Sequence, residues 1–127
     1  MFILEQLDHV ALTVRDIARS RQWYMETLGM EHRFPGAWEG VPTMLGLGST
    51  LVALFPADDV DSKTSSPENI RIEHFAFRAD RQNFAVAHRE LVAKGLDVTF
   101  KDHTLCHSIY FLDPDGHQLE ITTYEVP

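Results

Sequence analysis

The sequence predicts an α+β fold made of two tandem β-α-β-β-β modules, whose strands form a curved, roughly eight-stranded sheet. Two observations carry this prediction. The segment Ile72–Phe77 repeats the pattern of Leu7–Leu12 position by position, about 65 residues later in the chain. A helical pattern follows each segment and stops at a glycine, Gly29 in the first case and Gly95 in the second. An internal duplication of this length predicts two equivalent structural units.

The first module is expected to cover residues 5–56. Its opening strand alternates side chains between two faces, as a half-buried strand does. Asp16 is a good N-cap for a helix that begins near Ile17, and Gly29 stands where a left-handed residue would end it. Three further strands follow this helix, the last two as a hairpin. The expected strands of this module are residues 7–14, 31–34, 43–47 and 49–55.

The second module is expected to cover residues 70–125. Residues 57–69 are rich in Asp, Ser and Pro and are predicted to form the linker between the modules. In the last hairpin Asp113-Pro114-Asp115-Gly116 is a turn, because Pro fixes φ and Gly accepts a positive φ. The expected helix is residues 81–94 and the expected strands are 72–77, 97–101, 108–112 and 117–123. Residues 1–127 thus read as one domain.

Length, charge and cysteine content narrow the functional classes. The chain has 127 residues and a net charge of 11 − 19 = −8, which argues against nucleic acid or anionic membrane as a partner. No apolar run approaches the roughly 20 residues of a membrane span, and residues 1–5 show no signal-peptide pattern. Cys106 is the single cysteine, so no intrachain disulfide forms. These features favour a cytoplasmic protein.

Two histidines and one glutamate predict a metal site. His9 and His74 occupy the same position in the first strand of each module, and Glu120 lies between Leu119 and Ile121 in the last strand. A lone strand histidine is more often structural, but duplication of the position favours a shared role. A buried ionised carboxylate needs a cation beside it. Two imidazoles and one carboxylate suit Fe(II), Mn(II), Zn(II) or Ni(II) and leave coordination positions open.

The arrangement resembles the vicinal oxygen chelate superfamily, which includes glyoxalase I, bleomycin- and fosfomycin-resistance proteins and extradiol dioxygenases. The resemblance covers both strand-histidine segments, both helix-glycine ends and the run from Asp113 to Glu120. It implies that His9, His74 and Glu120 are the metal ligands. It also implies a small-molecule substrate whose two adjacent oxygens chelate a divalent ion, and a homodimer.

Within the superfamily the C-terminal region is most similar to the dioxygenase branch. That branch has a histidine-bearing segment, then Ser-x-Tyr-Phe, the Asp-Pro-Asp-Gly turn and the glutamate ligand. His103 or His107 matches the histidine, and Tyr110 matches the tyrosine. The resemblance implies that Tyr110 lies near the substrate and that one of these histidines moves protons, which an imidazole does well near neutral pH. Without such a role, Tyr110 would be a core residue and His103 and His107 would be surface residues. Fe(II) or Mn(II) is therefore favoured, with Zn(II) and Ni(II) as alternatives.

Three alternative functions stay open beside extradiol ring cleavage of a catechol. A glyoxalase-like lyase or isomerase would typically use a fourth ligand, a Glu where this chain has Val52 or Ala53. A fosfomycin-type thiol transferase usually has a Thr at the position of Ala11 and a Ser/Gly-rich loop where residues 105–107 fall. A bleomycin-resistance-like protein binds a small molecule without metal and usually lacks the ligand set. We therefore expect an oxidoreductase of dioxygenase type.

Overall fold

The computed structural model describes residues 1–57 and 72–127, which fall into two compact units, Met1–Ser65 and Ser66–Pro127. Apart from Ala57, the predicted linker lies outside the described residues. The elements of the first unit are β1 (His9–Val14), α1 (Ile17–Leu28), β2 (Glu31–Arg33), the short helix η1 (Ala37–Gly40), β3 (Thr43–Leu47) and β4 (Thr50–Pro56). Those of the second unit are β5 (Phe75–Arg78), α2 (Arg81–Ala93), β6 (Thr99–Asp102), β7 (His107–Leu112) and β8 (Gln118–Thr123).

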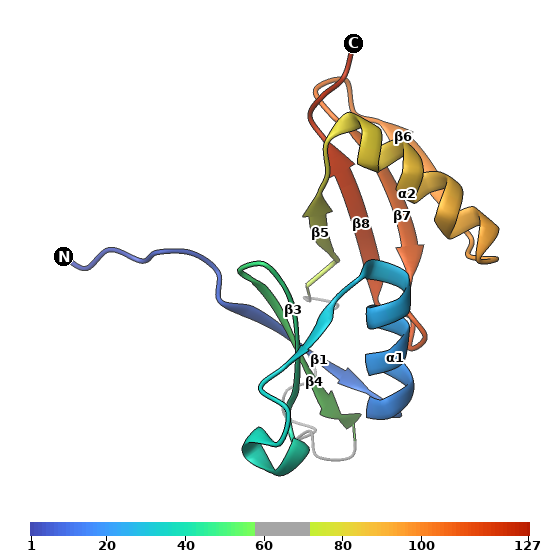
Figure 1. Ribbon diagram of the computed structural model, residues 1–127. Coiled ribbons are helices and arrows are strands. Elements are labelled where there is room, and N and C mark those ends of the chain that lie inside the picture. The colour runs from blue at the N-terminus through green and yellow to red at the C-terminus, as the bar shows by residue number, and fades with distance from the viewer. Residues whose placement is uncertain (58–71) are drawn as a thin grey trace, which may run out of the picture. The chain divides into compact units, whose positions relative to one another are not determined.

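The predicted fold class is confirmed. The eight strands of the described residues form two four-stranded sheets of the same topology, β1-β4-β3-β2 and β5-β8-β7-β6, each with one helix against it (Figure 1). Both opening strands begin later than predicted, at His9 and at Phe75, so His74 directly precedes β5 instead of lying inside it. The first residue pairs of these strands are His9 with Leu51 and Phe75 with Leu119.

In the first unit β1 runs parallel to β4, and α1 covers one face of the sheet. The Asp16 side chain accepts the backbone N–H of Arg19 at 3.1 Å, which satisfies a free donor at the start of α1. Gly29 ends the helix with φ of 72°, as predicted. The core between α1 and its sheet consists of Leu12, Val14, Tyr24, Leu45, Val52 and Leu54.

The second unit repeats this construction. The Asp80 side chain caps α2 by accepting the backbone N–H of Asn83 at 2.7 Å. Strand β5 runs parallel to β8, and β7 runs antiparallel to it. The core between α2 and its sheet consists of Phe84, Leu91, Ile109, Phe111, Leu119 and Ile121. Because side chains alternate along a strand, the residues between these point to the other face of the sheet.

The turn between β7 and β8 sets the register of the second sheet. The buried Asp113 side chain accepts the backbone N–H groups of Asp115 at 2.9 Å and His117 at 2.8 Å, and Gly116 has φ of 89°. This predicted turn places Tyr110 directly opposite Glu120 and Ser108 opposite Thr122. A slip of one residue would move every side chain of β8 to the opposite face, so the turn determines which side chains meet Glu120.

Candidate metal centre

Glu120 is a buried carboxylate on the face of the second sheet that α2 does not cover. It lies in β8 between Leu119 and Ile121, which belong to the core beneath α2. The residue is only 8% exposed. Burying an ionised carboxylate costs free energy unless polar partners compensate for the lost water. The described residues supply two such partners.

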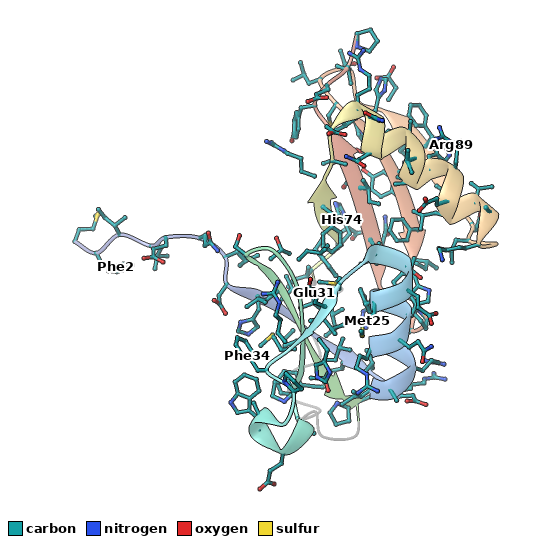
Figure 2. The ribbon with its side chains drawn as sticks, in the orientation of Figure 1. Phe2, Met25, Glu31, Phe34, His74 and Arg89 are labelled. Atoms are coloured by element: carbon teal, nitrogen blue, oxygen red, sulfur yellow. The ribbon has the colours of Figure 1, made fainter. Side chains whose placement is uncertain are left out.

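One partner is His74 and the other is Ser108. His74 Nε2 lies 2.9 Å from Glu120 Oε1, and the Ser108 hydroxyl donates to Glu120 Oε2 at 2.6 Å. Figure 2 shows His74 where the chain enters β5, next to the strand that carries Glu120. Each carboxylate oxygen therefore has its own partner, His74 just before β5 on one side and Ser108 in β7 on the other.

The donor atoms of His74 and Glu120 fit a metal ion. Two ligands about 2.1 Å from one ion and at right angles to each other lie about 3.0 Å apart. The observed separation of 2.9 Å between Nε2 and Oε1 matches this spacing, so an ion can replace the proton that the two atoms share. His74 Nδ1 is buried and has no hydrogen-bond partner among the described residues. Imidazole and carboxylate together suit the first-row divalent ions.

His9 lies in the first unit, at the start of β1. Its Nδ1 is 2.8 Å from Asp8 Oδ2, and both side chains are exposed to solvent. In residues 1–57 and 72–127 no three His, Cys, Asp or Glu side chains come close enough to hold an ion. The structure thus brings together two of the three predicted ligands, His74 and Glu120.

Tyr110 and His103 lie on the same side of the second sheet as Glu120. The Tyr110 ring makes an edge contact with the His74 ring, with centroids 5.8 Å apart, and its hydroxyl is 3.0 Å from His103 Nε2. Burial raises the pKa of the Tyr110 phenol above its ordinary value, and the negative charge of Glu120 raises it further. Tyr110 is therefore neutral and able to donate a hydrogen bond at physiological pH.

His107 is not brought to this cluster. Because side chains alternate along a strand, His107 lies with Ile109 and Phe111 on the face covered by α2, whereas Tyr110 lies on the opposite face. Its ring contacts Phe100 edge-on at 5.3 Å, and its Nε2 is 3.5 Å from Asp102 Oδ1. Of the two histidines that the sequence left open, only His103 reaches Tyr110.

A hollow of about 330 Å³ opens beside His74 and Tyr110. Lys101 lines it, with its ammonium 5.9 Å from the centre of the Tyr110 ring. The remaining lining residues are Glu73, Thr99 and Gln118. A small molecule bound here would meet the His74 imidazole, a phenol and a cation from one side of one sheet.

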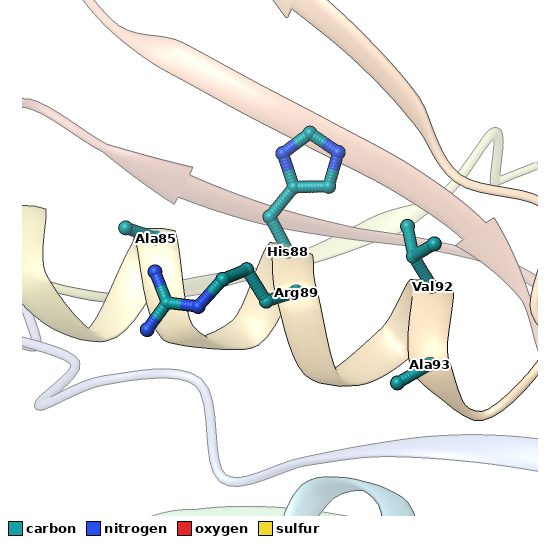
Figure 3. Close-up of a pocket in the computed structure, with 5 residues that line it drawn as sticks. All are labelled: Ala85, His88, Arg89, Val92 and Ala93. Atoms are coloured by element: carbon teal, nitrogen blue, oxygen red, sulfur yellow. The ribbon is translucent and has the colours of Figure 1, made fainter.

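A second hollow, of about 540 Å³, runs along α2 and has a different character (Figure 3). It is lined by Ala85, His88, Arg89, Val92 and Ala93. His88 points toward the sheet, where its ring stacks on Phe100, whereas Arg89 lies along the helix. This lining offers no carboxylate and one histidine that is already packed, so the hollow is larger but carries no comparable set of metal donors.

Sequence reasoning missed Ser108, Asp8 and Lys101. A signal for Ser108 was present, because pairing the two strands around the Asp113–Gly116 turn puts Ser108 and Tyr110 on the face of Glu120. Asp8 and His9 are adjacent in the sequence, but alternation along a strand places neighbouring side chains on opposite faces, so adjacency did not indicate a contact. Lys101 gave no signal, since its position depends on how β6 pairs with β7.

The profile of one protein family matches residues 6–121 of the chain, which is nearly all of it. The chain belongs to the Glyoxalase/Bleomycin resistance protein/Dioxygenase superfamily. This confirms the resemblance to the vicinal oxygen chelate proteins. The sequence left open whether Val52 or Ala53 is equivalent to Glu120. In the second sheet Glu120 pairs with Tyr110, and in the first sheet Ala53 pairs with Met44, which is equivalent to Tyr110, so Ala53 is the equivalent residue.

Relatives within the superfamily have different activities. The glutathione transferase FosA of Serratia marcescens is 29% identical over 94% of this chain and 81% of its own length. The catechol-2,3-dioxygenase of Bacillus subtilis is 25% identical over 91% of this chain, which spans 40% of that enzyme. An integron cassette protein from the mobile metagenome of a Halifax Harbour sewage outfall has a solved structure with a TM-score of 0.72 and 28% identity, covering 94% of this chain and 99% of its own.

Proposed function

We propose that the chain is a divalent-metal enzyme that acts on a small molecule with two adjacent oxygens, and that His9, His74 and Glu120 hold the ion. The observation that carries this proposal is the spacing of 2.9 Å between His74 Nε2 and the buried Glu120 Oε1. Because His74 directly precedes β5 and Glu120 lies in the neighbouring strand β8, the second unit presents two of the three ligands of a facial triad.

The case for His9 as third ligand is its equivalence to His74. His9 lies level with Leu51 in β4, and His74, directly before Phe75, lies level with Gln118 in β8. These are the same positions in two sheets of identical topology. A shared role explains why both repeats carry histidine at this position.

The reaction we propose is extradiol-type ring cleavage of a catechol, with Fe(II) or Mn(II) ahead of Zn(II) or Ni(II). When bound, such an ion supplies Lewis acidity toward the two substrate oxygens and redox chemistry toward dioxygen. The neutral Tyr110 hydroxyl donates a hydrogen bond to a substrate oxygen. His103 Nε2, 3.0 Å from that hydroxyl, accepts or returns a proton through it. The two side chains thus form a proton path at the edge of the hollow.

A second candidate is thiol transfer of the fosfomycin-resistance kind. It is favoured by the similarity to glutathione transferase FosA, which extends over almost the whole chain. The same three ligands serve this chemistry, which requires no redox change at the ion. Against it stand Ala11 and residues 105–107, where the resemblance leads us to expect a Thr and a Ser/Gly-rich loop.

Oxygen uptake by the Fe(II)-loaded chain tests the reaction. We expect dioxygen consumption with catechols, and a loss of about 100-fold in kcat/KM for His103→Gln because proton transfer is impaired. His107→Gln is the matched control and should retain near wild-type turnover, since His107 faces α2. A folded, iron-loaded protein that consumes no dioxygen with any catechol would contradict the dioxygenase proposal. Glutathione consumption by the Mn(II) form with fosfomycin would then support the second candidate.

The oligomeric state and the cellular location of the protein remain predictions. No helix among the described residues is long and apolar enough to cross a membrane. We propose a homodimer in the cytoplasm, and sedimentation of the purified protein measures the first of these. Nucleic acid is not expected as a partner, in view of the net charge of −8.

A further inference from the structure

We propose that Ser108 is a positioning residue that holds Glu120 as a single-oxygen metal ligand. The inference rests on the metal centre proposed above and goes beyond it, because it assigns different tasks to the two carboxylate oxygens of Glu120. Oε2 is occupied by a protein hydrogen bond, and Oε1 is the oxygen that meets the ion.

The Ser108 hydroxyl has one proton, and the geometry directs it to the carboxylate. Ser108 is fully buried, and its Oγ lies 2.6 Å from Glu120 Oε2, the short distance typical of a hydroxyl that donates to a charged oxygen. The neighbouring Thr122 hydroxyl is farther away, at 3.1 Å, and donates to the backbone carbonyl of His107 at 3.2 Å. The Ser108 hydroxyl therefore donates its hydrogen bond to Glu120 and not to Thr122.

The other carboxylate oxygen of Glu120, Oε1, points to His74, which directly precedes the neighbouring strand β5. Glu120 Oε1 faces His74 Nε2 at 2.9 Å, whereas Oε2 faces Ser108 on the opposite strand, β7. With Oε2 held in this way, Glu120 takes one coordination position instead of two. The coordination position that Oε2 does not occupy is then available to a substrate that binds through two oxygens. Ser108 thereby influences how many ligands the ion can accept from outside the protein.

The first unit gives independent support. Met44 in the first unit is equivalent to Tyr110 in the second, because each is paired with the residue at the position of Glu120. Two residues earlier in the chain, Pro42 is therefore equivalent to Ser108. The unit without a carboxylate, which has Ala53 in place of Glu120, thus has no hydroxyl at the position of Ser108 either. The hydroxyl and the carboxylate occur together in one unit and are both missing from these two positions of the other.

Titration of the purified full-length chain with Co(II) tests the proposal, because visible absorption of bound Co(II) weakens as the coordination number rises. We expect Ser108→Ala to raise the Kd for Co(II) about 10-fold, the typical effect of losing a hydrogen bond to a metal ligand. We also expect weaker visible absorption, as the freed Oε2 joins the ion. Ser108→Thr keeps the hydroxyl and should restore both properties toward wild type.

The matched control is Ser20→Ala, which removes a fully buried serine hydroxyl from α1 and should change neither the affinity nor the spectrum. Wild-type affinity and spectrum in Ser108→Ala would overturn the proposal. If Ser108→Ala does not fold, Ser108→Val replaces it, because valine has the shape of the threonine in Ser108→Thr but no hydroxyl, and the same outcomes apply. Failure of wild type itself to bind Co(II) would instead refute the metal centre on which this inference rests.

Discussion

The two units have the same topology and the same helix caps but present different chemistry on the sheet face that their helix leaves uncovered. In the second unit this face carries Glu120, Tyr110 and Ser108; in the first, the equivalent positions carry Ala53, Met44 and Pro42. The histidines are the feature that both units keep. The duplication therefore supplies the same framework twice, and the polar residues of the site are concentrated in one copy.

The surroundings of the two histidines differ in the same sense. The His74 side chain is 33% exposed and faces Glu120, whereas the His9 side chain is 44% exposed and faces the solvated Asp8. A buried carboxylate next to one imidazole creates a strong site for a cation, while the other imidazole has only an exposed carboxylate next to it. The second unit thus supplies the two ligands that the structure brings together, His74 and Glu120.

The largest effect is expected from placing a carboxylate at the equivalent position of the first unit. Ala53 is 1% exposed, and its partners in register are Ala11 and Met44, which offer no hydrogen bond from their side chains. Ala53→Glu should therefore lower the free energy of unfolding by about 3 kcal/mol, the cost of an uncompensated buried polar group. Urea denaturation of the metal-free protein measures it.

Thr50→Glu is the control for this substitution, because Thr50 lies in the same strand and is exposed. We expect that variant to stay within about 0.5 kcal/mol of wild type. An Ala53→Glu variant as stable as wild type would show that the two sheet faces do not differ in their tolerance of charge, and the comparison between the units would fail.

A smaller effect is expected at alkaline pH, from Tyr110. Its pKa in the folded protein is raised above 10.0, so the folded state holds the phenol proton at pH values where the unfolded chain has lost it. The stability that this contributes is full below pH 10 and declines as pH rises through the folded pKa. Ultraviolet difference titration of wild type against Tyr110→Phe isolates this phenol. Glu120→Gln should lower its pKa, and an unchanged titration in that variant would contradict the contact between the two groups.

Much of the fold could be predicted because the duplication and the helix caps are local signals. The left-handed Gly29, the N-cap Asp16 and the Asp113–Gly116 turn are each readable from a few neighbouring residues. The strand starts were misjudged because they depend on which residues pair with a strand elsewhere in the chain. Local patterns do not contain that information.

The site could be predicted less completely, for the same physical reason. Sequence reasoning selected His74 and Glu120, but that Glu120 Oε2 meets Ser108 follows only from the register of β7 and β8. The choice between His103 and His107 depends on where β7 begins, because each step along a strand reverses the direction of a side chain. Once β7 starts at His107, that residue faces α2 and His103 is left to reach Tyr110.

The most direct test of the account is the metal content and Mn(II) affinity of the anaerobically purified chain, measured for wild type, Glu120→Ala and Ala53→Ser. We predict about one equivalent of ion per wild-type chain, an affinity at least about 100-fold weaker in Glu120→Ala, and no change in Ala53→Ser. Equal metal binding by wild type and Glu120→Ala, or no binding by a folded wild-type chain, would contradict the claim that the second unit anchors a metal centre.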